Sequence, residues 1–212
     1  MGRVKVDISM SLDGYVAGPR QSREQPLGIG GEQLHEWAVR TASWRGSHGY
    51  EGGETGADDE VVAEQFAGVG AVVMGRGMFG GGPGPWPQPA WNGWWGEEPP
   101  FRRPVFVLTH HPREPLTLGE TTFRFVGDGI EAAIAAARTA ADGADVLVSG
   151  GAATADQALA AGLVDQLDLH VAPVLLGGGA RLFAALGEPP RLELERTLAS
   201  SLVTHLRCRV VR

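Results

Sequence analysis

The segment Asp145-Val146-Leu147-Val148-Ser149-Gly150-Gly151 decides the fold. Its apolar centre, closed by two glycines, predicts a strand that is buried on both faces, and a helical pattern follows from about residue 153. A buried strand that turns directly into a helix is typical of an α/β domain with a mostly parallel sheet. We therefore expect a central sheet between two layers of helices, which is a three-layer arrangement.

The same alternation of apolar strands and helices extends along the chain. Asp128 and Glu131 predict a capping box at the start of one helix, and a helical turn is expected around Leu182. Residues 192–198 and 202–211 predict a C-terminal antiparallel hairpin. The other strands are predicted at residues 4–11, 71–74, 104–109, 122–126, 145–149 and 166–174, and the helices at residues 31–40, 59–66, 128–141 and 153–162.

Two Gly-rich segments, at about residues 18–58 and 80–100, interrupt this pattern. We interpret them as insertions in a single domain of residues 1–212, and expect them to face the active site or an interface rather than the core. The second segment carries four tryptophans without a helical or strand period. These could cap a planar substrate, plug the long loop or form a dimer interface. The four are Trp86, Trp91, Trp94 and Trp95.

The composition excludes several classes of protein. Gly and Pro make up 46 of the 212 residues, but 43% of the residues are hydrophobic, so the chain can bury a core. It has no collagen period and no apolar run long enough to cross a membrane, so fibrous and membrane-spanning proteins are excluded. The net charge is −7 and no basic stripe is present, so nucleic acid is not expected as a partner.

Single residues exclude further classes of site. The only lysine, Lys5, is not in the Gly-Lys-Ser/Thr context of a P-loop. The only cysteine, Cys208, can form neither an internal disulfide nor a cysteine-pair zinc site, and we expect no metal. The N-terminus runs directly into a strand pattern without a signal segment, so a cytoplasmic protein is expected.

Glycines follow most of the predicted strands. Gly14, Gly75, Gly150 and Gly151 each follow a predicted strand within three residues, as do the glycines that begin at 177. In a parallel sheet these turns lie along the carboxyl edge, where ligands bind. Glycine there either simply closes a turn or lets backbone N–H groups approach a phosphate, and several on one edge favour a phosphate-bearing ligand.

Arg76 stands at one of these strand ends. Its guanidinium is suited to a phosphate, although a surface salt bridge is an equal alternative. Residues 75–80 also match the Gly-x-Gly-x-x-Gly dinucleotide pattern, but they run into Gly81-Gly82-Pro83, which cannot open a helix. We therefore reject a Rossmann-type site at this position.

Six segments in order resemble the dihydrofolate reductase-like superfamily, in the branch of the reductase domain of bacterial riboflavin biosynthesis. The match spans nearly the whole chain. The segments are Ser11-Leu12-Asp13-Gly14-Tyr15-Val16-Ala17-Gly18, Leu34-His35-Glu36-Trp37, Val72-Val73-Met74-Gly75-Arg76, Val107-Leu108-Thr109, Ser149-Gly150-Gly151, and 169–179 with Leu182-Phe183.

The resemblance implies an NADPH-binding reductase, often a homodimer. It implies that the turn at Gly75 and Arg76 binds cofactor phosphates, and that the loop from Asp13 to Ala17 closes over the nicotinamide. Met78 departs from the family, which usually has a threonine there. The full set of implied cofactor-binding residues is Gly14, Ala17, Gly75, Arg76, Met78, Thr109, His110, Gly150, Gly151, Ala152, Ala153 and Thr154.

A reductase must also supply a proton, and an acid in a partly buried pocket would suit this task. The candidates for catalysis are Glu36, His170 and Asp13, with Glu32 and His35 as alternatives. His170 is placed by the resemblance to face the substrate, but could equally be a core histidine. His35 and Trp37 are expected to contact the substrate, whereas His205 and His48 are expected on the surface.

The sequence thus predicts an NADPH-dependent reductase of a small planar heterocycle, pterin- or pyrimidine-like, or of its ribosyl derivative. Such an activity belongs to riboflavin or folate metabolism. Met78 and the unsettled choice of acid motivate an alternative, a non-catalytic protein that binds a nucleotide or a heterocyclic drug. Beyond a small-molecule substrate, the expected partner is a second copy of the chain, and neither a membrane nor nucleic acid.

Overall fold

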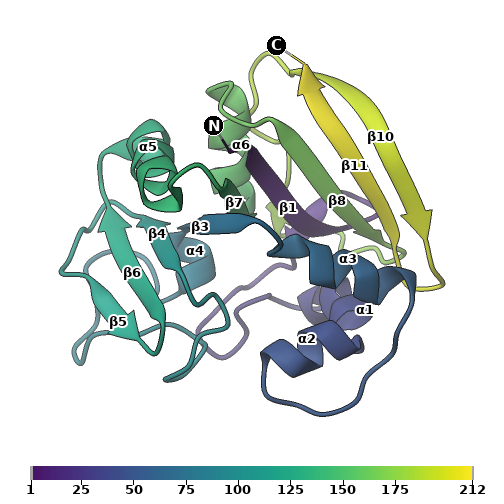
Figure 1. Cartoon of the computed structure of the whole chain (residues 1–212). Coiled ribbons are helices and arrows are strands. Elements are labelled where there is room, and N and C mark those ends of the chain that lie inside the picture. The colour runs from purple at the N-terminus through teal and green to yellow at the C-terminus, as the bar shows by residue number, and fades with distance from the viewer. Residues whose placement is uncertain (1, 212) are drawn as a thin grey trace.

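The computed structural model describes residues 2–211, which form a nine-stranded sheet with helices on both faces (Figure 1). The strands of this sheet are β1 (Val4–Ser11), β3 (Val69–Gly75), β4 (Pro104–Leu108), β5 (Leu116–Leu118), β6 (Thr121–Val126), β7 (Asp145–Gly150), β8 (Gln166–Ala172), β10 (Arg191–Ala199) and β11 (Thr204–Val211). The helices are η1 (Gly31–His35), α1 (Glu36–Val39), α2 (Ala42–Ser47), α3 (Ala57–Gln65), α4 (Arg76–Phe79), α5 (Gly129–Ala141) and α6 (Ala152–Ala160).

The strand order is β10-β11-β8-β1-β7-β3-β4-β6-β5. The six strands from β8 to β6 in this order pair in parallel, whereas β11 is antiparallel to β8 and β10 to β11. The predicted mostly parallel sheet with a C-terminal antiparallel hairpin is therefore confirmed. The deciding strand β7 lies between β1 and β3, near the middle of the sheet.

The face covered by α5 and α6 is apolar. Along α5, Ile130, Ala133, Ile134, Ala137 and Ala141 repeat at helical spacing and are all buried. They pack in one cluster with the residues of β1 and β7 that point to the same side. This spacing gives an apolar stripe that faces the sheet, and its burial supplies most of the stability of this layer.

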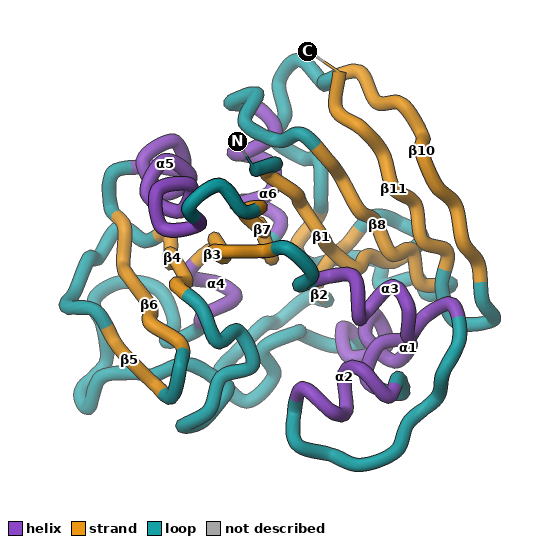
Figure 2. The backbone as a smooth tube through the Cα atoms, in the orientation of Figure 1, coloured by secondary structure: helices purple, strands orange, loops and turns teal. Residues whose placement is uncertain are grey.

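The opposite face is covered by two different layers. Over β1, β8 and β11 lie η1, α1 and α3, and α2 packs against α1 and α3. Figure 2 shows the long teal loop that joins α2 to α3. Over β4 and β6, the loop after α4 takes the place of a crossover helix. The ring of Trp95 stacks on Phe123 with 5.9 Å between centroids, beside Phe101 and Phe79.

This second layer corrects one prediction. The Trp-rich loop was expected to lie outside the core, yet Trp86, Trp91 and Trp95 pack against the buried aromatic cluster. The reason is the route of the chain, which must cross this face from the end of β3 to the start of β4. Large side chains are needed along that route to cover Phe123 and Val105, so hydrophobic plugging is the alternative that the structure favours.

Two further local predictions are wrong. Asp128 precedes α5 but makes no side-chain cap, because its backbone (φ −91°, ψ 18°) is not in the extended conformation that aims a capping carboxylate at the first turn. Around Leu182 there is no helical turn. Ala180 and Arg181 form strand β9, which pairs with β2 (Tyr15–Ala17), so a long-range backbone pairing outweighs the local preference.

Candidate functional site

The carboxyl ends of the parallel strands form one edge of the sheet, and most of the predicted cofactor-binding residues meet there. Neighbouring strands place Gly150 beside Met74, and Leu108 beside Gly75. The same order brings β1 next to β7, so the turns after β1, β7, β3 and β4 are consecutive along the edge. These turns carry Asp13, Gly14, Gly150, Gly151, Arg76, Thr109 and His110.

Gly75 must be glycine because the first turn of α6 lies directly against it. A Cβ on Gly75 would lie 2.3 Å from Oγ1 of Thr154, far inside van der Waals contact. The backbone of Gly75 at the end of β3 therefore packs directly against the buried Thr154 hydroxyl in the first turn of α6.

The first turn of α6 presents its backbone amides at this edge. Gly151 is the N-cap, provides no side-chain cap and has open space around it. Gly150 precedes it across a cis peptide bond, with φ +129°, which favours glycine. Ala152 and Thr154 are buried, while Ala153 is exposed. Uncapped amides and the helix dipole make this turn attractive to an anion.

Arg76 follows Gly75 and holds a guanidinium whose three nitrogens are shielded from solvent. Within residues 2–211 none of these nitrogens has a hydrogen-bond partner. The guanidinium stacks on the ring of Trp86 at 3.8 Å, and Arg113 lies 4.3 Å from the same ring. Burial lowers the pKa of Arg76, but a guanidinium stays charged in proteins. The guanidinium groups of Arg76 and Arg113 thus both lie against the Trp86 ring, and within residues 2–211 no carboxylate pairs with Arg76.

The segment after β4 lies against Trp86, the ring on which Arg76 stacks. Trp86 donates its indole N–H to the carbonyl of His111 at 2.6 Å. Thr109 is buried, and its hydroxyl oxygen accepts from the backbone N–H of His111 at 3.1 Å, while His110 is exposed. Met78 is half-buried, with its sulfur turned toward Gly150. Thr109 therefore follows the end of β4, and Met78 lies on α4 beside Gly150 at the end of β7.

The turn after β1 is held by a carboxylate. Asp13 accepts hydrogen bonds from the Ser11 hydroxyl at 2.6 Å and from the backbone amides of Leu176 and Gly177 at 3.1 and 2.7 Å. These bonds, that of Ser11 foremost, lower the pKa of Asp13 to about 2. The carboxylate therefore holds no proton at neutral pH, and this geometry favours a positioning role for Asp13.

Gly14 lies in the turn after β1, and Ala17 ends the short strand β2 that follows it. Gly14 has φ +87°, and its carbonyl accepts from the N–H of Leu182 at 2.9 Å. A Cβ on Gly179 would lie 2.0 Å from the Ala17 carbonyl oxygen. The turn after β1 and the loop after β8 therefore touch backbone to backbone and form one unit at the edge.

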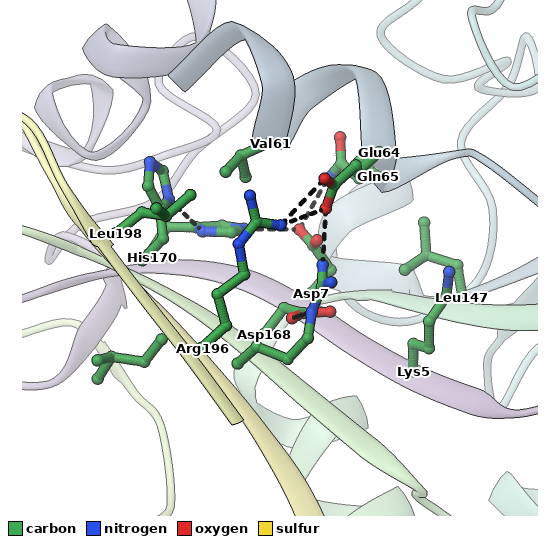
Figure 3. A pocket seen from close by; sticks show the side chains of 13 residues that line it. Lys5, Asp7, Val61, Glu64, Gln65, Leu147, Asp168, His170, Arg196 and Leu198 are labelled. Carbon is green, nitrogen blue, oxygen red and sulfur yellow. Dashed lines mark hydrogen bonds and ion pairs between the residues drawn. The ribbon is translucent and has the colours of Figure 1, made fainter. Parts of the chain in front are cut away.

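His170 lies on the polar face of the sheet, beneath α1 and α3 (Figure 3). It is 3% exposed, and its Nδ1 lies 2.8 Å from Nδ1 of His205, which is 5% exposed. The remote nitrogens contact carboxylates: His170 Nε2 lies 3.1 Å from Asp7 and His205 Nε2 lies 3.1 Å from Asp58. His205 was expected on the surface, and this is wrong because the register of β11 turns it under α3.

Trp37 and His35 join this cluster. The indole of Trp37 donates to the Ser9 hydroxyl at 3.2 Å, and its ring lies 4.8 Å from both histidine rings. Burial, together with the nearby His170, lowers the pKa of His35 to about 4. The structure therefore brings three of the predicted residues, His35, Trp37 and His170, to one place.

Glu36 lies elsewhere. It is exposed at the start of α1 and pairs with Arg40 at 3.8 Å, with both side chains about half exposed (52% and 50%). The alternative acid Glu32 is also exposed. The contacts of Glu36 are those of an ordinary helix surface and not of a buried acid.

A small cavity opens beside the histidines between α3 and the sheet (Figure 3). Its volume of about 30 Å³ has room for one or two water molecules. Lys5 and Asp7 of β1 line it, together with His170. The helix above is held by polar contacts: Glu64 pairs with Arg196 at 2.7 Å, and Gln65 donates to Asp7 at 2.7 Å. Of the residues of α3, Val61 alone is buried.

The sequence of residues 3–206 matches the profile of the RibD C-terminal domain. This chain belongs to the RibD C-terminal domain family. The resemblance drawn from the six segments is thereby confirmed at the level of the family. A search of curated protein sequences finds no match.

Solved structures similar to this RibD C-terminal domain share its fold at low sequence identity. A candidate riboflavin biosynthesis protein from Shewanella sp. PV-4 superposes with a TM-score of 0.64 at 22% identity, covering 99% of both chains. A diaminohydroxyphosphoribosylaminopyrimidine deaminase/5-amino-6-(5-phosphoribosylamino)uracil reductase from Thermotoga maritima gives 0.59 at 15% identity. This chain is covered to 99% and spans 57% of the Thermotoga protein.

A pyrimidine reductase-like protein from Corynebacterium diphtheriae gives a TM-score of 0.56 at 16% identity, covering all of this chain and 92% of its own. At these identities the likeness supports the dihydrofolate reductase-like fold. Two kinds of feature are not found among residues 2–211 of this RibD C-terminal domain. No helix there is long and apolar enough to cross a membrane, and no cluster of three His, Cys, Asp or Glu residues could hold a metal.

Sequence reasoning missed four residues of the site, namely Asp7, Asp58, Arg113 and His205. Asp7 carried a signal, because it alternates with apolar residues on a predicted strand and so faces the same side as Ser9. The others had none, since their positions depend on the register between β8 and β11 and on the path of two loops.

Proposed function

We propose that this RibD C-terminal domain is an NADPH-dependent reductase of a small planar heterocycle, pyrimidine- or pterin-like, or of its ribosyl derivative. The observation that carries the proposal is the Arg76 guanidinium, buried and without a hydrogen-bond partner among residues 2–211, at the carboxyl edge of the sheet. A buried cation is costly unless an anion pairs with it, so a phosphate is the ligand that fits. The membership of the family supports a reductase of the riboflavin pathway.

The residues present fit such a cofactor. Arg76 and Arg113 would hold a phosphate on the adenosine side, next to Thr109 and Trp86. The amides of the first turn of α6, at Gly151, would hold a pyrophosphate. When bound, NADPH supplies a hydride for the reduction of a ring double bond.

The chain itself would then bind and orient the heterocycle. The Trp37 ring lies between α1 and the sheet with its N–H fixed on Ser9, so its position is set before any ligand arrives. His35 carries a pKa of about 4 and is therefore neutral at pH 7, which leaves it able to accept or donate a hydrogen bond without adding charge. The turn from Asp13 to Ala17 is tied to the loop after β8 and would exclude water at the edge.

A second candidate is a non-catalytic binder of a nucleotide or heterocycle. Two observations favour it: Asp13, with a pKa of about 2, holds no proton at neutral pH, and Glu36 lies exposed against Arg40. A binder needs no acid. Oxidation of NADPH in the presence of a pyrimidine riboside, dihydrofolate or a pterin would exclude this candidate.

The test of the cofactor is binding measured by tryptophan fluorescence, since Trp86 lies on Arg76. Arg76→Ala is expected to weaken NADPH by roughly 10- to 100-fold, the size of one or two charge-assisted hydrogen bonds, and NADH much less. Arg191→Ala, on the exposed edge strand β10, is the matched control and should change neither. Equal losses for both nucleotides would contradict a phosphate-specific role. We also propose a homodimer, which sedimentation of the full chain would test.

A further inference from the structure

The histidine pair on the polar face stands in a chain of four titratable groups. His170 and His205 are register partners on β8 and β11, and their Nδ1 atoms lie 2.8 Å apart. Each remote Nε2 atom lies 3.1 Å from a carboxylate oxygen, of Asp7 on β1 and of Asp58 on α3. Four elements therefore contribute one group each to a single line of three hydrogen bonds, of which Figure 3 labels the His170 and Asp7 end.

The geometry fixes the number of protons in this line. Each of the three contacts joins two atoms that both carry lone pairs, so each needs one proton between them. Three contacts need three protons, whichever partner holds each one. With both carboxylates ionised, the two rings hold three protons and the histidine pair carries one positive charge. A pair with only two protons would set two lone pairs against each other in a buried site.

The surroundings are consistent with one excess proton. Burial acts to raise the pKa of Asp7, but His170, Gln65 and Lys5 outweigh it and hold that pKa below its usual range. Burial, opposed by Asp58 and reinforced by His170, lowers the pKa of His205, so a second positive charge is disfavoured.

The remaining groups around the line are fixed or neutral. His35 on η1 faces His170 with a pKa of about 4, and Trp37 on α1 covers both rings. Beyond Asp7, Lys5 pairs with Asp145 at 3.3 Å, while Asp168 pairs with Arg207 at 2.7 Å. The charged groups next to the line are thus already paired with one another. The excess proton of the line therefore belongs to the two histidines.

We propose that the line Asp58–His205–His170–Asp7 is the proton reservoir of the reductase, with Asp7 as its outlet. This rests on the proposed function. Asp7 and His170 line the cavity under α3, which has room for one or two water molecules, so a water there would connect the Asp7 end of the line to a substrate. At the other end, the Asp58 side chain is 18% exposed and meets solvent.

The transfer balances as follows. Reduction of a ring C=N or C=O bond adds one hydride, from the reduced nicotinamide cofactor, and one proton. The proton on His170 Nε2 moves to Asp7 and then through a water in the cavity to the substrate atom, while the proton shared by the Nδ1 atoms settles on His170. The line keeps two protons, the pair becomes neutral, and one proton from water restores the resting state.

His205 and Asp58 act through His170 and are positioning residues, so their test must separate proton supply from the docking of α3. Asp58→Asn keeps the shape of the contact and removes the charge that favours the protonated pair. As the pH is raised, the rate of NADPH oxidation should be lost earlier than in the unchanged protein. The midpoint of this alkaline loss should move down by roughly one pH unit. Glu60→Gln removes a charge from the exposed side of the same helix and should leave the midpoint in place. Equal midpoints in both variants would overturn the reservoir.

A second measurement is independent of turnover. In ¹⁵N-labelled full-length protein, histidine NMR should show protons on both Nε2 atoms and one strongly deshielded proton between the Nδ1 atoms. The deshielded signal should vanish in His205→Gln and persist in His48→Gln, whose histidine stacks on Trp44 away from the line. Two protons in place of three would overturn the proposal even if NADPH binds. Failure of NADPH to quench the tryptophans would instead overturn the proposed function and leave the proton count standing.

Discussion

The two faces of the sheet are built from the same strands but differ in the interactions that hold them together. On β1, Val4, Val6 and Ile8 point into the apolar layer under α5 and α6, whereas Lys5, Asp7 and Ser9 point under α1 and α3. One face is a close-packed core. The other is buried almost as deeply, yet it is held by hydrogen bonds and ion pairs. Because successive side chains of a strand point to opposite faces, β1 contributes apolar residues to the core on one face and polar residues to the candidate site on the other.

The largest effect should come from breaking the apolar face. Ile134 is 2% exposed on α5, so Ile134→Ala removes buried methyl groups and leaves a cavity. We expect a loss of about 2–5 kcal/mol in the free energy of unfolding, measured by urea denaturation. NADPH binding by the protein that remains folded should be unchanged. A loss as small as that of a surface substitution would mean that this face does not carry the stability.

Acid should weaken the polar face selectively. The pKa of His35 falls from 6.5 unfolded to about 4 folded, so its neutral form is favoured by folding. That contribution is fully present above pH 6.5 and is lost as the pH falls toward about 4, with an upper limit of about 3 kcal/mol. The lowered pKa of His205 acts in the same direction. Thermal unfolding across this range should show the loss, and His35→Gln should make the curve flatter.

A smaller effect is expected from Asp7→Asn. The substitution keeps the shape of the side chain but removes the charge that faces His170 and Lys5. Stability at neutral pH should drop by about 1–3 kcal/mol, the cost of a weakened buried polar contact. The rate of NADPH oxidation should fall far more than cofactor affinity. Ser9→Ala, which removes the hydroxyl under Trp37, tests whether any polar loss on this face has the same consequence; an equal drop in rate would deny Asp7 a special role.

The smallest effect is expected at Glu36. An exposed pair at helical spacing contributes little, so Glu36→Gln should change the free energy of unfolding by less than about 0.5 kcal/mol. The same variant decides whether this carboxylate takes part in the reaction. A large loss of turnover would mean that Glu36 is the proton donor and that the reaction does not take place on the polar face.

Much of the apolar face could be predicted from the sequence, and much less of the polar one. The continuous run of β7 and the helical spacing in α5 are local patterns, so β7, α5 and α6 were predicted close to their observed bounds, whereas the short elements β2, β5, β9, α2 and α4 were not predicted. The meeting of His170 with His205 depends on the register of β8 and β11, which no local pattern encodes. The path of the Trp-rich loop likewise depends on which buried aromatic rings need cover, so its contribution to the core was not predictable.

Lys5 offers one more consequence of this division. The only lysine of the chain is 7% exposed, and its ammonium group is paired with Asp145. Reagents that acylate amines therefore find no accessible side chain in the folded protein. The rate at which the Lys5 side chain becomes labelled, measured separately from the α-amino group of the chain, therefore reports how often this face of the sheet opens.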